Sequence, residues 1–167
     1  VSPDMSDIRQ LMDDNHIQGF VGASVWIGLE YEGELVACVG VKRRKEEGVW
    51  DLIRYATSKQ VIGGFSKLLS HFKKNHEWTM IFTYAHLDYS HGNLYEKSGF
   101  VEKYITPPGM YYAKNRTRYR REKFMKHKLK NKLEIFDGSK TERENMAMNG
   151  FVRIYDAGSI RYEMYNT

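Results

Sequence analysis

The first third of the chain has the periodicity of a helix followed by strands. After a Ser-Pro-Asp start, apolar residues recur at helical spacing at Met5, Ile8, Leu11 and Met12. The segments 23–31 and 34–41 predict two antiparallel strands around a turn at Gly33. A third strand is predicted over 49–56.

The middle of the chain alternates helices with strands. A helix is predicted over 67–74 from the spacing of its apolar residues, and 79–84 is an apolar run typical of a buried strand. A short helix over 92–98 is followed by strands over 100–103 and 110–114. This order predicts an α/β fold with a mixed central sheet flanked by helices.

The pattern changes after Arg116. We predict a basic helix over 119–133 and then a short helix that begins with capping-box spacing at Thr141. The segments 151–155 and 159–165 flank an Asp-Ala-Gly turn and predict a terminal β-hairpin. The C-terminal part of the chain is therefore expected to be a basic helical extension closed by a hairpin.

A length of 167 residues suits one domain with a core of its own. We expect an α/β domain over 1–115 and, over 116–167, an appendage of basic helix, small helix and hairpin. No apolar run approaches the roughly 20 residues that span a bilayer. No secretory signal is visible, and the single Cys38 forms no internal disulfide. These features predict a cytoplasmic protein without a membrane partner.

Charge is distributed unevenly along the chain. The net charge of +5 comes from 26 Lys and Arg against 21 Asp and Glu. Between Lys103 and Lys132, eleven basic residues accompany one acid, Glu122, so this segment carries about +10 and the remainder about −5. Such asymmetry favours a polyanionic partner over general solubility.

The basic segment interleaves its cations with aromatic residues, a pattern that favours phosphate contacts combined with stacking on bases. We therefore expect nucleic acid, and DNA first, as the partner. The alternative is a solvated helix face. The candidate nucleic-acid-binding residues are Lys114, Arg116, Arg118, Arg120, Arg121, Lys123, Lys126 and Lys128.

A glycine-containing loop lies between the third strand and the following helix. Its sequence is Gln60-Val-Ile-Gly63-Gly64-Phe65, followed by Ser66. Glycines let a backbone approach a ligand closely, and the N–H groups at a helix start bind anions. A turn that needs positive φ is the alternative. The candidate cofactor-binding residues are Gln60, Gly63, Gly64 and Ser66.

This loop and the later Tyr95 with Gly99-Phe100 resemble the GNAT acetyltransferase superfamily over about residues 16–113. In that superfamily the motif Arg/Gln-x-x-Gly-x-Gly/Ala binds the pyrophosphate of coenzyme A. The resemblance implies a GNAT-like fold and acetyl-CoA or a related acyl donor. Phe65 stands where the family has Gly or Ala, so its ring is expected to crowd the pyrophosphate and weaken binding.

A narrower resemblance covers nearly the whole chain in short pieces. The chain is similar to the Mom family of phage DNA-modification proteins, which alter adenine, at His16-Ile-Gln-Gly19, Leu52-Ile-Arg54, Ser66, Tyr84-Ala85 and Gly92-x-x-Tyr95. It also resembles modules of phage proteins, some fused to homing-endonuclease-like domains. A phage origin would place the protein in a bacterial host cell. His86 stands where this group tends to have Asp, with Asp88 as the substitute.

The candidate catalytic residues implied by this resemblance are His16, Arg54, Ser66 and Tyr95. Their chemistry suits group transfer: His16 as general base, Arg54 holding an anion, Tyr95 protonating a leaving group and Ser66 bonding a phosphate or the substrate. Structural alternatives are a helix cap for His16, an ion pair of Arg54 with Asp51 or Glu34, and a core position for Tyr95. The irregular spacing of His86, Asp88 and His91 does not predict a metal site.

Three functions follow in order of preference. The first is a Mom-like group transferase that modifies a DNA base. The second is a non-catalytic DNA-binding module associated with a phage homing endonuclease, which an opening at Val1 rather than methionine mildly favours. The third is an acetyl-CoA-dependent N-acetyltransferase. A cleft open between the strands of Arg54 and Tyr84 favours an enzyme, whereas a filled one favours the binding module.

Overall fold

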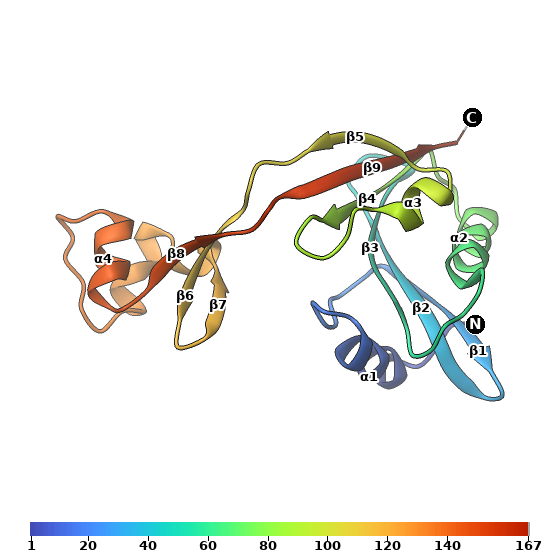
Figure 1. Cartoon of the computed structure of the whole chain (residues 1–167), viewed down its shortest axis with the longest axis horizontal. Coiled ribbons are helices and arrows are strands. Elements are labelled where there is room, and N and C mark those ends of the chain that lie inside the picture. Colours follow the sequence, from blue (N-terminus) through green and yellow to red (C-terminus); the bar gives the residue numbers. More distant parts are fainter. Residues whose placement is uncertain (167) are drawn as a thin grey trace. The chain divides into compact units, whose positions relative to one another are not determined.

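The computed structural model describes residues 1–166, which form two compact units (Figure 1). The first unit consists of Val1–Ala85, Gly92–Tyr104 and the C-terminal residues from Ile160. The second consists of His86–His91 and Ile105–Ser159, and is thus inserted within the sequence of the first.

The first unit is built on a six-stranded sheet with the strand order β1-β2-β3-β4-β9-β5. The neighbours β1, β2 and β3 pair antiparallel, and β3 pairs parallel with β4. The elements are α1 (Met5–Asn15), β1 (Val25–Tyr31), β2 (Glu34–Arg43), β3 (Val49–Thr57), α2 (Gly64–Asn75), β4 (Met80–His86), α3 (Asn93–Lys97), β5 (Val101–Ile105) and β9 (Ser159–Tyr165). The predicted mixed α/β sheet flanked by helices is confirmed.

Helices α1 and α2 cover opposite faces of this sheet. The apolar side of α1 packs against a face that includes Cys38 and Ala56. From α2, Phe65 contacts Tyr55. Since Tyr55 and Ala56 are neighbours on β3, their side chains point to opposite faces. The sheet is therefore the middle layer of three.

Strands β3 and β4 meet only at their beginnings. Their pairing runs from Val49↔Met80 to Asp51↔Phe82, although β3 continues to Thr57 and β4 to His86. The pairing of β2 with β3 shifts register just beyond this point, where Val41 faces Leu52. The two parallel strands thus diverge in the middle of the sheet.

The second unit has a three-stranded sheet with the order β7-β6-β8 and a layer of short helices. Its core is formed by Tyr112, Phe124, Leu129 and Met146. Its elements are β6 (Met110–Lys114), β7 (Thr117–Arg120), the 3₁₀ helices η1 (Arg121–Phe124) and η2 (Lys126–Asn131), α4 (Glu142–Met148) and β8 (Val152–Tyr155). The capping box predicted at Thr141 is present at the start of α4.

The basic α-helix predicted over 119–133 is not formed. Asn115 and Arg116 adopt left-handed backbone conformations, with φ of 50° and 61°. They form a two-residue turn that folds β7 back on β6. Extended backbone at Met125 then separates η1 from η2. The tyrosine-rich segment thus follows its strand propensity.

The terminal β-hairpin is also not formed. Strand β8 pairs with β6 in the second unit, while β9 lies between β4 and β5 in the six-stranded sheet. The alternating residues Ile160, Tyr162 and Met164 are buried, with exposed fractions of 7%, 0% and 9%. This apolar face requires a core, which the six-stranded sheet supplies. The last strand of the expected appendage therefore belongs to the first unit.

Candidate functional site

The divergence of β3 and β4 contains a hydrogen-bonded chain of polar groups. The hydroxyl of Thr83 on β4 donates to the carbonyl oxygen of Leu52 on β3, at 2.8 Å. The Tyr95 hydroxyl of α3 is hydrogen-bonded to the Thr83 hydroxyl.

Burial raises the pKa of Tyr95, and this effect outweighs the opposing hydrogen bond with Thr83 and the positive charge of Arg54. Tyr95 is therefore protonated at neutral pH, the state that the predicted role of proton donor requires. The alternative for Tyr95 was a purely structural position in the core. Tyr95 is only half-buried, so it fits that alternative only in part.

Arg54 forms a hydrogen bond that connects β3 with the segment that follows α1. Its Nε donates to the carbonyl oxygen of Gly19 at 3.2 Å, and one terminal nitrogen donates to the carbonyl of Ile53. The ion pair considered for Arg54 is not formed with Asp51, because Asp51 is paired with Arg44. The Arg54 guanidinium thus lies where its charge acts on both His16 and Tyr95.

His16 caps the C-terminus of α1, with its backbone N–H donating to the carbonyl of Met12. Its ring nitrogen Nδ1 accepts a hydrogen bond from the backbone N–H of Gln18 at 3.1 Å. Burial lowers the pKa of His16, and the charge of Arg54 lowers it further. The ring is therefore neutral at neutral pH, with its proton on Nε2.

This tautomer changes the role expected for His16. With Nδ1 engaged as an acceptor, Nε2 offers an N–H donor and no lone pair. His16 is thus suited to donating a hydrogen bond to a developing negative charge, and not to the general-base role that the residue type suggested. Both its capping and its ring geometry follow from position 16 at the end of α1.

Ser66 lies apart from these three residues. It is exposed on α2 and lines a shallow surface hollow with Lys67, Ser70, His71 and Lys74. The structure therefore brings His16, Arg54 and Tyr95 into electrostatic contact, but not Ser66. A catalytic role for Ser66 finds no support in this geometry.

The glycine loop before α2 leaves its backbone accessible. Gly63 is the N-cap of α2 with φ of 70°, and a Cβ added there would meet no atom within 4 Å. A 12-residue helix begins at Gly64 and directs its N-terminal dipole at this space. The loop therefore fits the diphosphate of an acyl-CoA donor.

Phe65 does not project across the mouth of this loop. Its ring is only 3% exposed and packs edge-on between Tyr55 and Tyr95, at centroid distances of 5.0 and 5.9 Å. The backbone N–H of Phe65 is hydrogen-bonded to the Tyr55 hydroxyl. The ring thus occupies interior space beside the divergence of β3 and β4, and not the position over the pyrophosphate that the sequence suggested.

Gln60 is exposed beside a pocket of about 440 Å³ next to the loop. The pocket is mainly apolar, with two lysines among its lining residues: Leu29, Glu30, Tyr31, Val36, Lys59, Gln60, Val61, Ile62 and Lys67. Gln60 therefore lies at the loop, as predicted, while its side chain belongs to this pocket.

The basic residues of the second unit are divided between two faces. Arg116 lies at the hairpin turn, and Arg118 and Arg120 alternate along β7 on one face of the sheet. The guanidinium of Arg118 lies 4.5 Å from the ring centroid of Tyr111. These three arginines form one group.

The remaining candidates lie toward the helical layer. Arg121 forms an ion pair with Glu142 at 3.1 Å, and Glu142 also accepts from the Tyr112 hydroxyl. The ammonium groups of Lys114 and Lys123 lie over the rings of Phe151 and Tyr119. Lys128 donates a hydrogen bond to the backbone carbonyl of Glu122. Lys126 is exposed on η2. The single cationic helix face expected from the sequence is therefore not present.

Thr83 and Tyr55 are the functional candidates that sequence reasoning missed. Thr83 is a polar residue within the apolar run 79–84, and this was its only signal. Within residues 1–166, no group of three or more His, Cys, Asp or Glu side chains is arranged to hold a metal ion. No helix among these residues is long and apolar enough to cross a bilayer.

Compared by sequence, the chain matches no family model and no curated protein. Its fold is similar to that of the ribosomal-protein-S18-alanine N-acetyltransferase from Escherichia coli, with a TM-score of 0.58 and 13% identity over 99% of this chain and 91% of that one. An acetyltransferase from Bacillus subtilis in complex with CoA gives a TM-score of 0.58 and 14% identity over 100% and 96%.

A GNAT family acetyltransferase from Elizabethkingia anophelis with acetyl-CoA bound gives a TM-score of 0.51 and 18% identity, over 98% of this chain and 92% of that one. These similarities extend over almost the whole of each chain. The chain therefore has the fold of the GNAT acetyltransferases.

Proposed function

We propose that the chain is a group transferase that takes an acyl group from an acyl-CoA-type donor and transfers it to a base in nucleic acid, with DNA as the preferred substrate. The observation that carries this proposal is the grouping of His16, Arg54 and Tyr95 at the divergence of β3 and β4. The three residues come from the C-cap of α1, from β3 and from α3, far apart in sequence.

The donor, when bound, supplies an electrophilic thioester carbon and a sulfur leaving group. Gly63 and the first turn of α2 would hold its diphosphate. Tyr95 holds the proton that the departing sulfur takes up as the carbon–sulfur bond breaks. The proton released by the acceptor nitrogen restores Tyr95 through solvent. The Nε2–H of His16 and the charge of Arg54 favour the negative charge that develops during attack.

Nucleic acid as acceptor is supported by the charge of the second unit. Its 13 Lys and Arg against seven Asp and Glu give it a formal charge of +6, whereas the first unit carries −1. A polyanion is therefore attracted to the inserted unit and not to the transferase fold itself. Because a base inside a duplex is inaccessible to such a site, unpaired substrates are the preferred ones.

A second candidate is a binding module that has the GNAT fold without catalysis. The observation that favours it is the row of Tyr55, Phe65 and Tyr95, whose rings occupy the space beside the strand divergence. In this alternative the hydrogen-bonded groups at Thr83 serve stability only. The two candidates differ in whether substitution of Tyr95 alters chemistry.

The deciding experiment combines purified protein, radiolabelled acetyl-CoA and other acyl-CoA donors, and unpaired DNA or RNA, followed by mass spectrometry of the released nucleosides. We expect a modified nucleoside with the unaltered protein, and its loss in Tyr95→Phe and Arg54→Gln. Ser70→Ala, on the exposed side of α2, is the matched control and should keep activity.

The outcomes separate the candidates. Nucleic acid binding without any modified nucleoside, in extracts that supply other donors as well, would favour the binding module. Label transferred to a protein or small amine in place of nucleic acid would favour an N-acetyltransferase.

A further inference from the structure

The sheet of the second unit has one face covered by helices and one face without them. The covered face includes Tyr112, which is 1% exposed and packs with Phe124, Leu129 and Met146. The opposite face, here called the open face, consists of Tyr111, Ala113, Arg118, Arg120, Val152 and Ile154, which the strand pairing places side by side. None of these six residues is buried.

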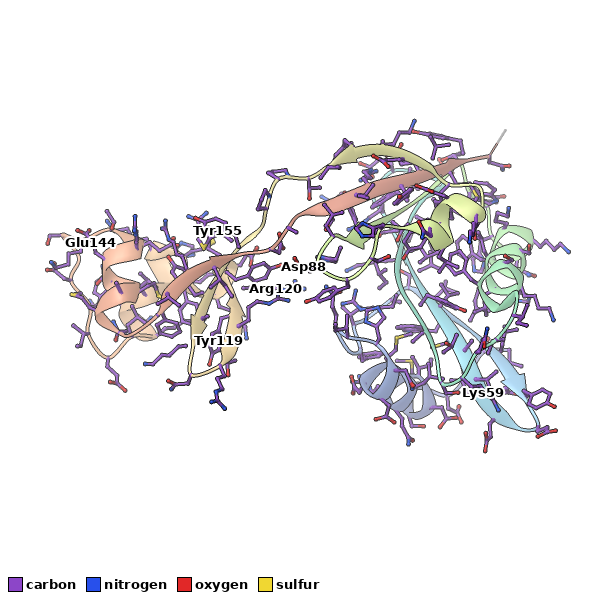
Figure 2. All side chains as sticks on the ribbon, viewed as in Figure 1. Lys59, Asp88, Tyr119, Arg120, Glu144 and Tyr155 are labelled. Carbon is purple, nitrogen blue, oxygen red and sulfur yellow. The ribbon has the colours of Figure 1, made fainter. Side chains whose placement is uncertain are left out.

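Neighbouring residues on β7 show the division directly. Tyr119 and Arg120, both labelled in Figure 2, are adjacent and therefore point to opposite faces. Tyr119 packs against Phe124 and Phe151 in the core, while Arg120 is exposed. The arginines of β7 are thus directed away from the helical layer.

The open face has the chemistry of a stacking platform. The Arg118 guanidinium lies over the ring of Tyr111, whose hydroxyl is hydrogen-bonded to Asp156. A guanidinium that lies over an aromatic ring is itself planar and can stack with a further planar group such as a base. Arg120 and Arg116 lie beside this pair along the hairpin and supply positive charge.

We propose that the open face binds a single strand of nucleic acid, with a base stacked on the Arg118–Tyr111 pair and phosphates contacted by Arg120 and Arg116. This inference rests on the proposed function, which names nucleic acid as the partner. It adds which surface binds the nucleic acid and that the bound form is single-stranded. The charge of +6 on the unit favours a polyanion, and the exposed Val152 and Ile154 offer apolar contact to sugars and bases. The lysines of η1 and η2, which belong to the helical layer, are not part of this surface.

The test compares two variants of the full chain with equal change in charge. Arg118→Glu/Arg120→Glu alters the open face, and Lys126→Glu/Lys130→Glu alters exposed positions on η2. The probe is a fluorescent oligo-dT strand of about 20 nucleotides, measured by anisotropy at several salt concentrations. We expect the arginine variant to lose at least about tenfold in affinity, as the loss of one stacked base predicts. We expect the lysine variant to lose less than threefold.

A third variant separates stacking from charge. Arg118→Lys keeps the charge but removes the planar group, so it should weaken oligo-dT binding by about five- to tenfold with almost no change in the salt dependence. Binding of inorganic polyphosphate, which has no bases, should be equal in Arg118→Lys and the unaltered protein. Circular dichroism and hydrogen exchange of residues 105–159 establish that each variant is folded.

The possible failures are distinguishable. Greater loss in the lysine variant than in the arginine variant would overturn the open face while leaving nucleic acid as the partner. Equal binding of Arg118→Lys and unaltered protein to oligo-dT would overturn base stacking. No binding of oligo-dT by the unaltered protein would overturn this inference, whereas acyl transfer to another acceptor would identify the proposed nucleic acid function as the part that failed.

Discussion

The Thr83 hydroxyl on β4 donates to the carbonyl oxygen of Leu52 on β3, one residue beyond the last pair at which these strands meet. At the point where the backbone hydrogen bonds between β3 and β4 end, this side-chain hydrogen bond still joins the two strands. Because the Thr83 hydroxyl is also hydrogen-bonded to the Tyr95 hydroxyl, one buried residue links the sheet to the proposed proton donor. Its position determines where that proton is held.

Replacing Thr83 by Val should destabilise the first unit by about 1–3 kcal/mol, because the Leu52 carbonyl and the Tyr95 hydroxyl lose their buried partner. Thr83→Ser should keep most of the stability. Urea unfolding followed by tryptophan fluorescence measures this unit selectively, since Trp26, Trp50 and Trp78 all belong to it. Ser70→Ala, at an exposed serine on α2, is the control and should change stability by less than about 0.5 kcal/mol.

His16 should make the stability of the first unit depend on pH. Its pKa in the folded chain is lowered by burial and by Arg54, so on acidification the unfolded chain takes up this proton first. Stability therefore falls as pH drops below the ordinary histidine value of about 6.5. His16→Asn should reduce this dependence, whereas the non-titrating control Ser70→Ala on α2 should leave it. A pH-independent difference between His16→Asn and the unaltered protein would contradict the assignment.

The Arg54 contribution can be measured at the His16 ring itself. Removing the positive charge in Arg54→Gln should raise the pKa of His16, because the charge is one of the two causes that lower it. Titration of the ring protons by NMR gives the value directly. An unchanged or lower pKa in the variant would show that Arg54 and His16 are not electrostatically coupled.

Coenzyme A should bind weakly, with a dissociation constant between tens of micromolar and millimolar, or about −4 to −6 kcal/mol. Gly63→Ala should weaken it at least about tenfold, because a Cβ enters the space where a phosphate would approach. Gly33→Ala in the β1–β2 turn is a matched control: both glycines have positive φ and open space around the added Cβ. Equal effects of the two variants in calorimetry would argue against a phosphate at Gly63.

Phe65→Ala addresses the ring beside the divergence. Truncating a phenyl group that is 3% exposed should cost about 3–5 kcal/mol of stability. Because the buried ring does not project across the glycine loop, the variant should bind coenzyme A no more tightly than the unaltered protein. Tighter binding by Phe65→Ala in calorimetry would instead show that the ring limits access of the donor.

Duplex DNA binding should depend steeply on salt, with a log–log slope of about −4 to −7 if roughly five to eight phosphates are contacted. A salt-independent affinity would rule out the phosphate contacts. Arg121→Glu should act differently from the β7 arginines, because Arg121 is paired with Glu142. We expect faster hydrogen exchange in α4 of that variant and little change in DNA affinity.

The order of helices and strands could be predicted from the sequence, because it depends on local signals: the spacing of apolar residues and the glycines at turns. The pairing of β9 could not, since residues 159–165 are separated from β4 and β5 by the inserted unit. An Asp-Ala-Gly turn between two strands favours a local hairpin, and only the buried Ile160, Tyr162 and Met164 reveal the distant partner.

The site was partly predictable for a similar reason. His16, Arg54 and Tyr95 were found through family resemblance, and their grouping follows from the fold. Ser66 matched a motif position, but the helical period of α2 turns it outward. The tautomer of His16 depends on one backbone N–H two residues later, and Thr83 matters through partners on two other elements. These contacts cannot be inferred from residue type or spacing in the sequence.

The place of β9 has a consequence for how the chain folds during synthesis. The strand lies between β4 and β5, so the six-stranded sheet stays incomplete until residues 159–165 have been synthesised. Every other strand of that sheet is made before residues 106–159, the main segment of the inserted unit. The insertion has a core of its own, and folding first would shorten the loop that β9 must close. Refolding of the first unit should therefore be slowed by substitutions that unfold the second, even though they touch none of its contacts.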